Sequence, residues 1–187
     1  MNEMTKDKEQ SFNIHSHLSS RFLDTNIHRT LIDEKENTAT FFSYNLSGQI
    51  VGYQQYRPLG DKYEYQHPKL GKYYTYRNRH TPTVALFGME SYDFTPDILF
   101  IVEGVFDAAR LTSRGISCVA TMANNPPRDY KNFFSCLPRK TVVICDGDEA
   151  GIKLAKFGDT YEVVPKEFKD LGDAPNDYIN FLIERYC

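Results

Sequence analysis

Ile98-Leu99-Phe100-Ile101-Val102-Glu103-Gly104 opens the stretch that indicates the fold of this chain, and Thr141-Val142-Val143-Ile144-Cys145-Asp146-Gly147-Asp148-Glu149-Ala150-Gly151 closes it. Both begin with an uninterrupted apolar run rich in β-branched residues, which is typical of strands buried on both faces of a parallel sheet. Open α/β sheets place their functional groups at the carboxyl ends of such strands. We therefore predict that Glu103, Asp146 and Asp148 converge at one edge of a parallel sheet.

These three acidic residues suggest a metal site. Carboxylates that meet at a sheet edge repel one another unless a cation neutralises them. Oxygen-only ligands favour a hard cation, so the residue types indicate Mg²⁺ or Mn²⁺ rather than zinc. The alternative is that Glu103 and Asp148 only cap the helices that follow. Capping explains either residue alone equally well, whereas the two strand-end motifs together favour the metal site.

The longer motifs carry a family resemblance. Val102-Glu103-Gly104-Val105-Phe106-Asp107 and Asp146-Gly147-Asp148-Glu149-Ala150-Gly151 resemble the Toprim domain, which primases, topoisomerases, small nucleases and recombination-mediator proteins share. They are most similar to the DnaG-type primases of bacteria and phages. The resemblance covers about residues 41–180 and departs from the family at Met122-Ala123, where related chains usually carry Gly-Thr or Gly-Ser.

The resemblance implies an α/β fold, in which residues 97–187 form a Toprim parallel sheet with flanking helices. Residues 38–96 would form a small α+β basic subdomain ahead of it, and residues 1–37 an N-terminal segment without an assigned role. Within the subdomain, a β-hairpin is predicted at 38–56 around a turn that ends at Gly48. This hairpin, the Arg57 and Lys62-Tyr63 that follow it, and Leu86-Phe87-Gly88-Met89 are similar to the region that precedes the Toprim domain in these primases.

A basic, tyrosine-rich segment follows the hairpin. Residues 57–80 contain six lysines and arginines against two acidic residues, a local net charge of +4 in a chain whose net charge is −3. Cations that hold phosphates, beside rings that stack on bases, suit a single-stranded template or a nucleotide, although a solvated β-surface would have the same composition. The primase resemblance favours the first interpretation, and it assigns template or triphosphate binding to Arg57, Lys62, Arg77 and Arg79.

A second acidic segment lies near the end of the chain, at Lys169-Asp170-Leu171-Gly172-Asp173-Ala174-Pro175-Asn176-Asp177. It resembles the loop that supplies further metal-binding carboxylates in related primases. Asp170 follows the lysine as in the shorter family loops, whereas Asp173 and Asp177 bracket Pro-Asn as in the longer ones. We expect Asp173, and after it Asp170, to be a ligand. Asp177 is expected to help begin a final helix at 176–186.

Composition limits the protein class. A chain of 187 residues with 41% hydrophobic content is sufficient for one core. The four cysteines form no C-x-x-C pair and no zinc spacing. No signal peptide, membrane-spanning apolar run or Walker A motif is visible. We therefore expect a cytoplasmic protein of a bacterium or a phage-infected bacterial cell, without membrane contact.

The resemblance implies a primase catalytic core that makes short RNA primers on a single-stranded DNA template from ribonucleoside triphosphates, with Mg²⁺ or Mn²⁺. Glu103, Asp146 and Asp148 would be the catalytic and metal-binding residues, with general-base action as a second role for Glu103. A replicative helicase or a separate zinc-module protein is an expected partner. Two alternatives stay open: a Toprim nuclease that uses the same carboxylates, and a non-catalytic accessory protein that binds nucleic acid or the replisome.

Overall fold

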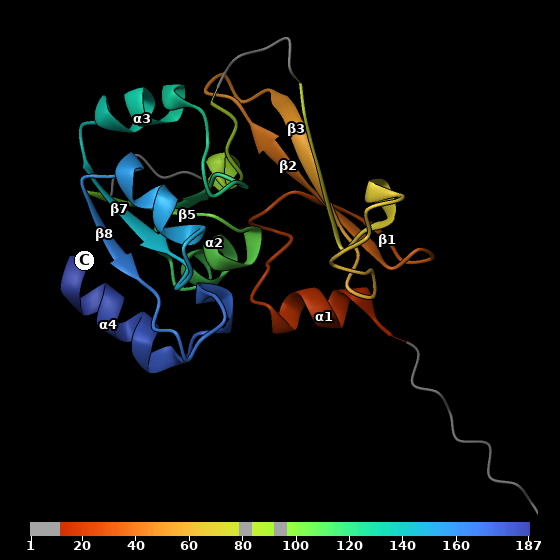
Figure 1. Cartoon of the computed structure of the whole chain (residues 1–187). Coiled ribbons are helices and arrows are strands. Elements are labelled where there is room, and N and C mark those ends of the chain that lie inside the picture. Colours follow the sequence, from red (N-terminus) through yellow and green to blue (C-terminus); the bar gives the residue numbers. More distant parts are fainter. Residues whose placement is uncertain (1–11, 79–83, 92–96) are drawn as a thin grey trace, which may run out of the picture.

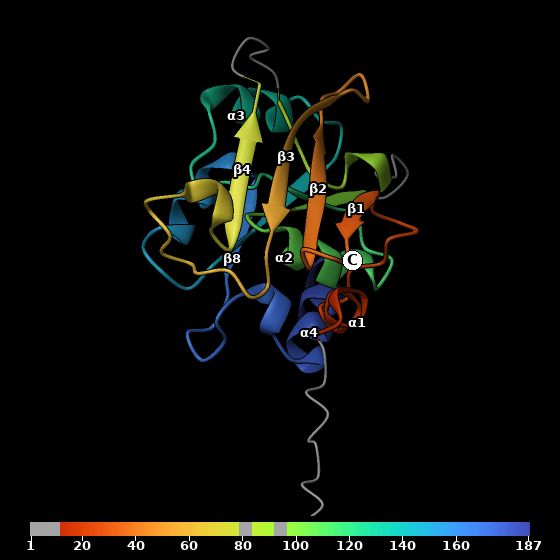
Figure 2. The same ribbon diagram turned by 90° about the vertical axis from the view of Figure 1, so that its right-hand side faces the viewer.

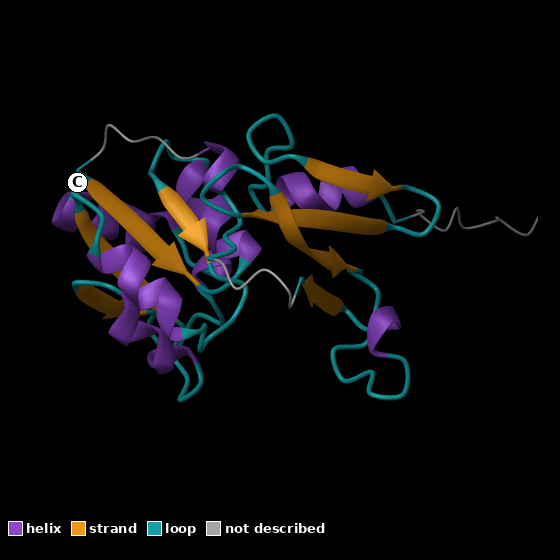
Figure 3. Ribbon diagram, turned by 90° about the horizontal axis from the view of Figure 1, so that it is seen from above, coloured by secondary structure: helices purple, strands orange, loops and turns teal. Residues whose placement is uncertain are grey.

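Two four-stranded sheets lie side by side in the computed structural model of the chain (Figures 1 and 3). The structure describes residues 12–78, 84–91 and 97–187. The first sheet is antiparallel and comes from the first half of the chain, and the second is parallel and comes from the second half. The predicted α/β fold, a parallel sheet with flanking helices behind a smaller α+β region, is confirmed.

The antiparallel sheet has the strand order β1-β2-β3-β4. The predicted hairpin is its centre: β2 (Thr38–Tyr44) pairs with β3 (Ile50–Tyr56) across a turn where Gly48 has a φ of +73°. The sequence pattern missed the edge strands, β1 (Thr30–Asp33) and β4 (Tyr73–Arg77). A 3-10 turn, η1 (Pro68–Leu70), interrupts the long connection between β3 and β4.

The parallel sheet has the strand order β6-β5-β7-β8. Its strands are β5 (Ile98–Val102), β6 (Cys118–Ala120), β7 (Lys140–Cys145) and β8 (Thr160–Val163). The chain leaves β5 towards β6 on one side and leaves β7 towards β8 on the other. The carboxyl ends of the neighbours β5 and β7 therefore flank a topological switch point, where α/β sheets bind ligands.

The helices are α1 (Ile14–Ser20), α2 (Val105–Thr112), α3 (Arg128–Ser135) and α4 (Asn176–Tyr186). Short 3-10 helices lie at η2 (Met89–Ser91), η3 (Gly151–Phe157) and η4 (Leu171–Asp173). Helix α2 runs into a left-handed glycine, Gly115, with a φ of +74°, a common way for helices to end. No helix within the described residues is both long and apolar enough to cross a bilayer.

Two layers of core cover the faces of the parallel sheet. Alternate residues of β5 point to opposite sides, so Phe100 enters one cluster and Leu99 the other. The first cluster lies against α2 and α4 and continues into α1 and the inner face of the antiparallel sheet, at Phe41 and Tyr56. The second cluster lies under α3 and η3. The first cluster therefore joins both sheets in one core.

A short extended segment connects the two sheets directly. The backbone of Leu86 exchanges two hydrogen bonds with Tyr44 at the end of β2, at 2.9 and 3.0 Å. The next residue, Phe87, exchanges two with Ala120 of β6, both at 3.0 Å. Gly88 then turns with a φ of +89°, and a Cβ there would lie 2.9 Å from the Cys118 carbonyl oxygen. The apolar-glycine element is therefore the backbone link between the sheets.

Candidate active site between the two sheets

A cavity of about 360 Å³ lies between the carboxyl edge of the parallel sheet and the inner face of the antiparallel sheet. Carboxylates line it, from Glu103, Asp107, Asp146 and Asp170, and we call these four residues the acidic wall. Cations from other elements also line it, from Arg21 after α1 and from Lys62 and Lys72 between β3 and β4. We call these three residues the basic wall.

Glu103 is the first residue after β5. Burial raises its pKa to about 7, and the nearby charges of Asp146 and Asp148 add to this effect. It does not cap the helix that follows, because Gly104 is the N-cap residue of α2 and its amide donates to the Asp107 carboxylate. Glu103 is therefore a half-buried carboxyl that faces like charges, which is common at functional sites.

Asp146 follows β7 and lies beside Glu103, as predicted from the two strand-end motifs. Its pKa is raised to about 6 by burial and by the charges of Asp170 and Asp148. Gly151 packs tightly over it, since a Cβ at position 151 would lie 2.7 Å from the Asp146 Cβ. The glycine at the end of the motif is therefore needed for the turn that presents this carboxyl.

Asp148 has a different environment. Its Oδ1 atom accepts a 2.6 Å hydrogen bond from the Gly151 amide at the start of η3, and its side chain is exposed. It does not line the cavity, although its charge reaches Glu103 and Asp146. Asp148 therefore closes the turn that leads into η3, whose N-cap residue is Ala150, and neither Asp148 nor Glu103 is the N-cap of the helix that follows it.

Asp107 is a site residue that the sequence motifs contained and the sequence reasoning overlooked. Burial and the charges of Asp146 and Asp170 raise its pKa to about 8. Its two oxygens accept hydrogen bonds from the Gly104 amide at 3.1 Å and from the Gly172 amide at 2.8 Å. Asp107 therefore ties the turn after Glu103 to the loop that carries Asp170. The available signal was its place three residues after the helix N-cap.

The fold separates Asp170 from Asp173, the two predicted ligands of the late acidic segment. Asp170 lines the cavity, and its Oδ1 accepts from the Asp173 amide at 3.0 Å. Asp173 lies outside the cavity lining, in an ion pair with Arg21 at 3.5 Å. Lys169 lies 3.8 Å from Asp170 and 3.7 Å from Asp173. Of the two predicted ligands, Asp170 is the one that the structure brings next to Asp146.

The donor set fits a hard divalent cation by its chemistry. All candidate ligands are carboxylate oxygens, and burial, followed by the nearby like charges, raises the pKa of Glu103, Asp107 and Asp146. A bound cation would relieve this repulsion. Within the described part of the chain, however, no three acidic, histidine or cysteine side chains already form a metal-binding group.

The basic wall contains one cation that no motif indicated. Arg21 stacks its guanidinium over the Phe106 ring at 4.6 Å and pairs with Asp170 at 3.7 Å. Because tertiary packing of α1 brings it there, no local pattern in the sequence could have revealed it. Lys62 and Lys72 reach the cavity from the loop between β3 and β4.

The other predicted cations lie elsewhere. Arg77 is held by the parallel-sheet region, donating to the Tyr130 hydroxyl at 3.1 Å and to the Thr121 carbonyl. Arg57 donates to Gln55 Oε1 at 2.7 Å. Neither arginine lines the cavity, and Arg79 lies outside the described residues. Of the four cations predicted to bind template or triphosphate, the structure places Lys62 in the cavity.

Met122 also lines the cavity and has an unusual backbone. Its φ of +52° is left-handed, a region that favours glycine, and its amide donates to the Glu103 carbonyl at 2.8 Å. Glycine adopts this conformation without strain, so the glycine that the family resemblance leads us to expect here would suit it. This chain has a methionine at that position, in the lining of the cavity beside Glu103.

No protein-family profile matches the chain, and no curated protein sequence matches it significantly. Solved structures do match. The Aquifex aeolicus primase, in its zinc-binding and RNA polymerase domains, aligns with a TM-score of 0.65 at 18% identity over 97% of this chain and 55% of that one. The chain has the fold of the DnaG primase catalytic core.

Two further DnaG-type structures support this fold assignment. The Escherichia coli primase catalytic core has a TM-score of 0.61 at 16% identity, over 91% of this chain and 59% of that one. The primase fragment of the bacteriophage T7 primase-helicase protein has a TM-score of 0.55 at 12% identity, over 99% and 82%. This chain spans between 52% and 60% of the first bacterial primase structures that it matches.

Proposed function

We propose that this chain is a primase catalytic core that synthesises short RNA primers on single-stranded DNA. One observation carries the proposal: within the fold of DnaG primase cores, carboxylates at the ends of β5 and β7 line one cavity together with the basic wall. Joining a nucleoside triphosphate to a primer needs both groups, because the leaving pyrophosphate and the template backbone are anionic and the reaction uses a bound divalent metal.

Glu103, Asp146, Asp148 and Asp170 are the residues that would hold Mg²⁺ or Mn²⁺. We place Asp170 ahead of Asp173 because Asp170 lines the cavity. When bound, the cation would neutralise the triphosphate and the departing pyrophosphate. Asp107 would keep the two ligand-bearing turns together through its bonds to Gly104 and Gly172.

The chain's own cations and Glu103 supply the remaining roles. Lys62, Lys72 and Arg21 would bind phosphates of the nucleotide or template in the same cavity. Glu103, with a pKa of about 7, would exchange a proton near neutral pH. It would take that proton from the primer 3′-hydroxyl if it acts as the general base rather than as a ligand.

The similar structures suggest the partners. One is a DnaG primase catalytic domain bound to single-stranded DNA, and another is part of a phage primase-helicase protein. We propose single-stranded DNA and ribonucleoside triphosphates as template and substrates. A replicative helicase or a separate zinc-module protein would then direct the chain to its start sites, in a bacterium or a phage-infected cell.

The test is direct. The chain is incubated with single-stranded DNA, radiolabelled ribonucleoside triphosphates and Mg²⁺ or Mn²⁺, and the products are separated on a denaturing gel. Short products that need both template and metal, and that Asp146→Asn abolishes, are expected. A parallel reaction with end-labelled DNA detects the nuclease alternative, because shortening of the DNA without primer synthesis would overturn the proposal. DNA binding without either reaction would indicate the accessory protein instead.

A further inference from the structure

The turn that follows β6 holds the backbone of Glu103. Thr121 donates its amide to the Val102 carbonyl at 3.0 Å, and Met122 donates its amide to the Glu103 carbonyl at 2.8 Å. These two bonds continue the pairing of β6 with β5 beyond Ala120, as far as the residue that carries the candidate metal-binding carboxyl. The position of the Glu103 backbone therefore depends on this turn.

The turn has a conformation that needs support. Met122 has a φ of +52°, in the left-handed region that is unfavourable for a residue with a side chain. Thr121 is completely buried, so its carbonyl oxygen has to find a donor within the protein rather than in water. A donor at this carbonyl would hold the peptide between Thr121 and Met122 in its observed orientation.

Arg77, the last residue of β4, supplies this donor from the other sheet. Its Nη2 atom donates to the Thr121 carbonyl, and its Nη1 atom donates to the Tyr130 hydroxyl at 3.1 Å. Figure 2 shows the end of β4 beside α3, the helix that carries Tyr130. A planar guanidinium that donates in two directions has a fixed orientation, which a lysine ammonium would not have.

Tyr130 is itself held in place. It is 2% exposed, and its hydroxyl donates to the Ala85 carbonyl at 2.8 Å and accepts from the Ala85 amide at 3.0 Å. With the bond from Arg77, these contacts use the one donor and both acceptor positions of the hydroxyl. Ala85 directly precedes the Leu86-Phe87 link between the sheets, so Arg77 is held at a fixed point relative to both of them.

We propose that Arg77 is a positioning residue for the metal-binding carboxylates. Its bond to Thr121 stabilises the left-handed turn at Met122, and that turn fixes the backbone of Glu103 at the cavity. Arg77 does not line the cavity, so it acts through the turn and not by touching substrate or metal. The inference rests on the proposed function, because it takes Glu103 as one of the metal-binding residues. It replaces the template or triphosphate role that the family resemblance assigned to Arg77.

The experiment measures the Mn²⁺ affinity of the full chain by calorimetry, together with kcat and KM of primer synthesis. Arg77→Met is expected to weaken Mn²⁺ binding and to lower kcat, each by about tenfold, since residues that support metal ligands contribute 10–100-fold. The KM for ribonucleoside triphosphate should stay unchanged, because Lys62 and Lys72 remain in the cavity. Asp146→Asn should remove the heat of Mn²⁺ binding and so identify it with this site.

Met122→Gly tests how Arg77 acts. Glycine adopts the left-handed conformation without strain, so the turn then depends less on the arginine. In a chain that already carries Met122→Gly, the effect of Arg77→Met on Mn²⁺ affinity should shrink from about tenfold to about twofold, a coupling of the size that neighbouring residues show. A purely structural role of Arg77 would give the same decrease with and without Met122→Gly.

Arg114→Met is the matched control. Arg114 also joins distant parts of the chain, through a 2.8 Å bond from its guanidinium to Asn180 of α4, but it does not line the cavity. Its replacement should leave Mn²⁺ affinity unchanged. Tyr130→Phe decides the question if Arg77→Met fails to fold, because it keeps the ring and removes only the hydroxyl that orients the guanidinium. It should weaken Mn²⁺ binding in the same direction, and urea unfolding checks that each variant is folded.

Three results would overturn the proposal. Wild-type Mn²⁺ affinity in Arg77→Met and Tyr130→Phe would show that neither side chain positions the carboxylates, and a raised KM in Arg77→Met beside it would assign Arg77 to phosphate binding. An equal decrease with and without Met122→Gly would show that the turn is not the route. An equal decrease in Arg114→Met would reduce the effect to lost stability. A wild-type chain that binds Mn²⁺ but makes no primers would contradict the proposed function alone, since the calorimetric comparison still decides the role of Arg77.

Discussion

The acidic wall and the basic wall face the same cavity but are built in different ways. The acidic wall holds its carboxyls close together, and three of them have raised pKa values. The basic wall spreads its charges over α1 and a loop, where Arg21 already pairs with Asp170. Crowded like charge opposes folding, so the acidic wall is costly to maintain without a cation. Its presence indicates a function more strongly than the basic wall does.

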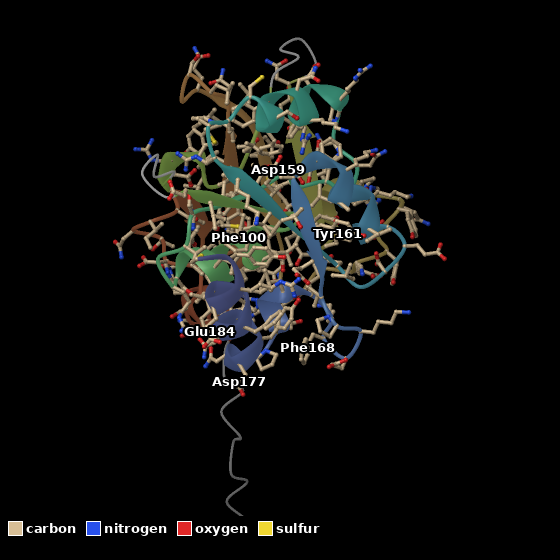
Figure 4. All side chains as sticks on the ribbon, turned by 90° about the vertical axis from the view of Figure 1, so that its left-hand side faces the viewer. Phe100, Asp159, Tyr161, Phe168, Asp177 and Glu184 are labelled. Carbon is tan, nitrogen blue, oxygen red and sulfur yellow. The ribbon has the colours of Figure 1, made fainter. Side chains whose placement is uncertain are left out.

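The largest effect is expected from removing a charge in the acidic wall or beside it. Asp146→Asn and Asp148→Asn should lower primer synthesis by at least about a hundredfold, since even residues that only support metal ligands contribute 10–100-fold. The measurement is primer yield per unit time with Mg²⁺ or Mn²⁺. Asp177→Asn, at the start of α4 (Figure 4), is the matched control. Wild-type yield in both Asp146→Asn and Asp148→Asn would show that these carboxyls hold no essential metal.

The acidic wall should make the stability of the metal-free protein depend on pH. Glu103 has a folded-state pKa of about 7 against an ordinary 4.5, whereas Asp146 has one of about 6 and Asp107 one of about 8, both against an ordinary 3.8. Between these values the folded state binds more protons than the unfolded state. The free energy of unfolding should therefore fall as the pH rises from about 4 to about 8.

Urea unfolding in EDTA across that pH range measures the effect. Glu103→Gln should flatten the dependence, and added Mg²⁺ should raise stability most at the alkaline end, where the carboxylates are ionised. A stability that rises with pH over the same range would contradict the raised pKa values.

The basic residues should separate into structural and binding groups. Arg77→Met removes hydrogen bonds to Tyr130 and to the Thr121 carbonyl, so it should lower the free energy of unfolding by about 1–3 kcal/mol. Lys62→Met changes an exposed side chain and should alter stability by less than about 0.5 kcal/mol. Urea unfolding of both variants at one pH measures these two changes in the free energy of unfolding. Equal free energies of unfolding in the two variants would show that the hydrogen bonds of Arg77 do not stabilise the fold.

The smallest expected effects distinguish Lys62, which lines the cavity, from Arg57, which does not. Lys62→Ala should weaken nucleotide binding several-fold, whereas Arg57→Ala should leave nucleotide binding unchanged. Both should weaken binding of single-stranded DNA and reduce its slope of log affinity against log salt by about 0.7 for each phosphate that the variant no longer binds. Calorimetry with nucleotide and anisotropy with DNA over a salt series measure these quantities. A decrease of nucleotide affinity in Arg57→Ala would place that arginine at the cavity.

The sequence predicted the parts of the fold that local patterns encode. The β5 and β7 runs are contiguous, so their carboxyl ends and the adjacent Glu103 and Asp146 could be inferred before the structure. The β2–β3 hairpin was equally clear from its turn. The edge strands β1 and β4 were missed, because their partly exposed residues show no continuous apolar run.

Sequence reasoning missed those residues of the candidate site that only tertiary packing brings together. Asp107 carried no assigned role because its partner Gly172 lies far along the chain. Arg21 reaches the cavity only through the packing of α1. The charge count of residues 57–80 was informative about composition, but it could not show that Arg77 is held by Tyr130 while Lys62 faces the cavity.

The Leu86-Phe87 link has a consequence for how the molecule opens. Its backbone hydrogen bonds join β2 to β6, so the two sheets cannot swing apart about a hinge at this point without breaking them. We therefore expect the amides of Tyr44, Leu86, Phe87 and Ala120 to exchange with solvent only in the same rare, global opening. The width of the cavity is then set by the rigid body of the protein, and substrate entry depends on loops and side chains rather than on a motion between domains.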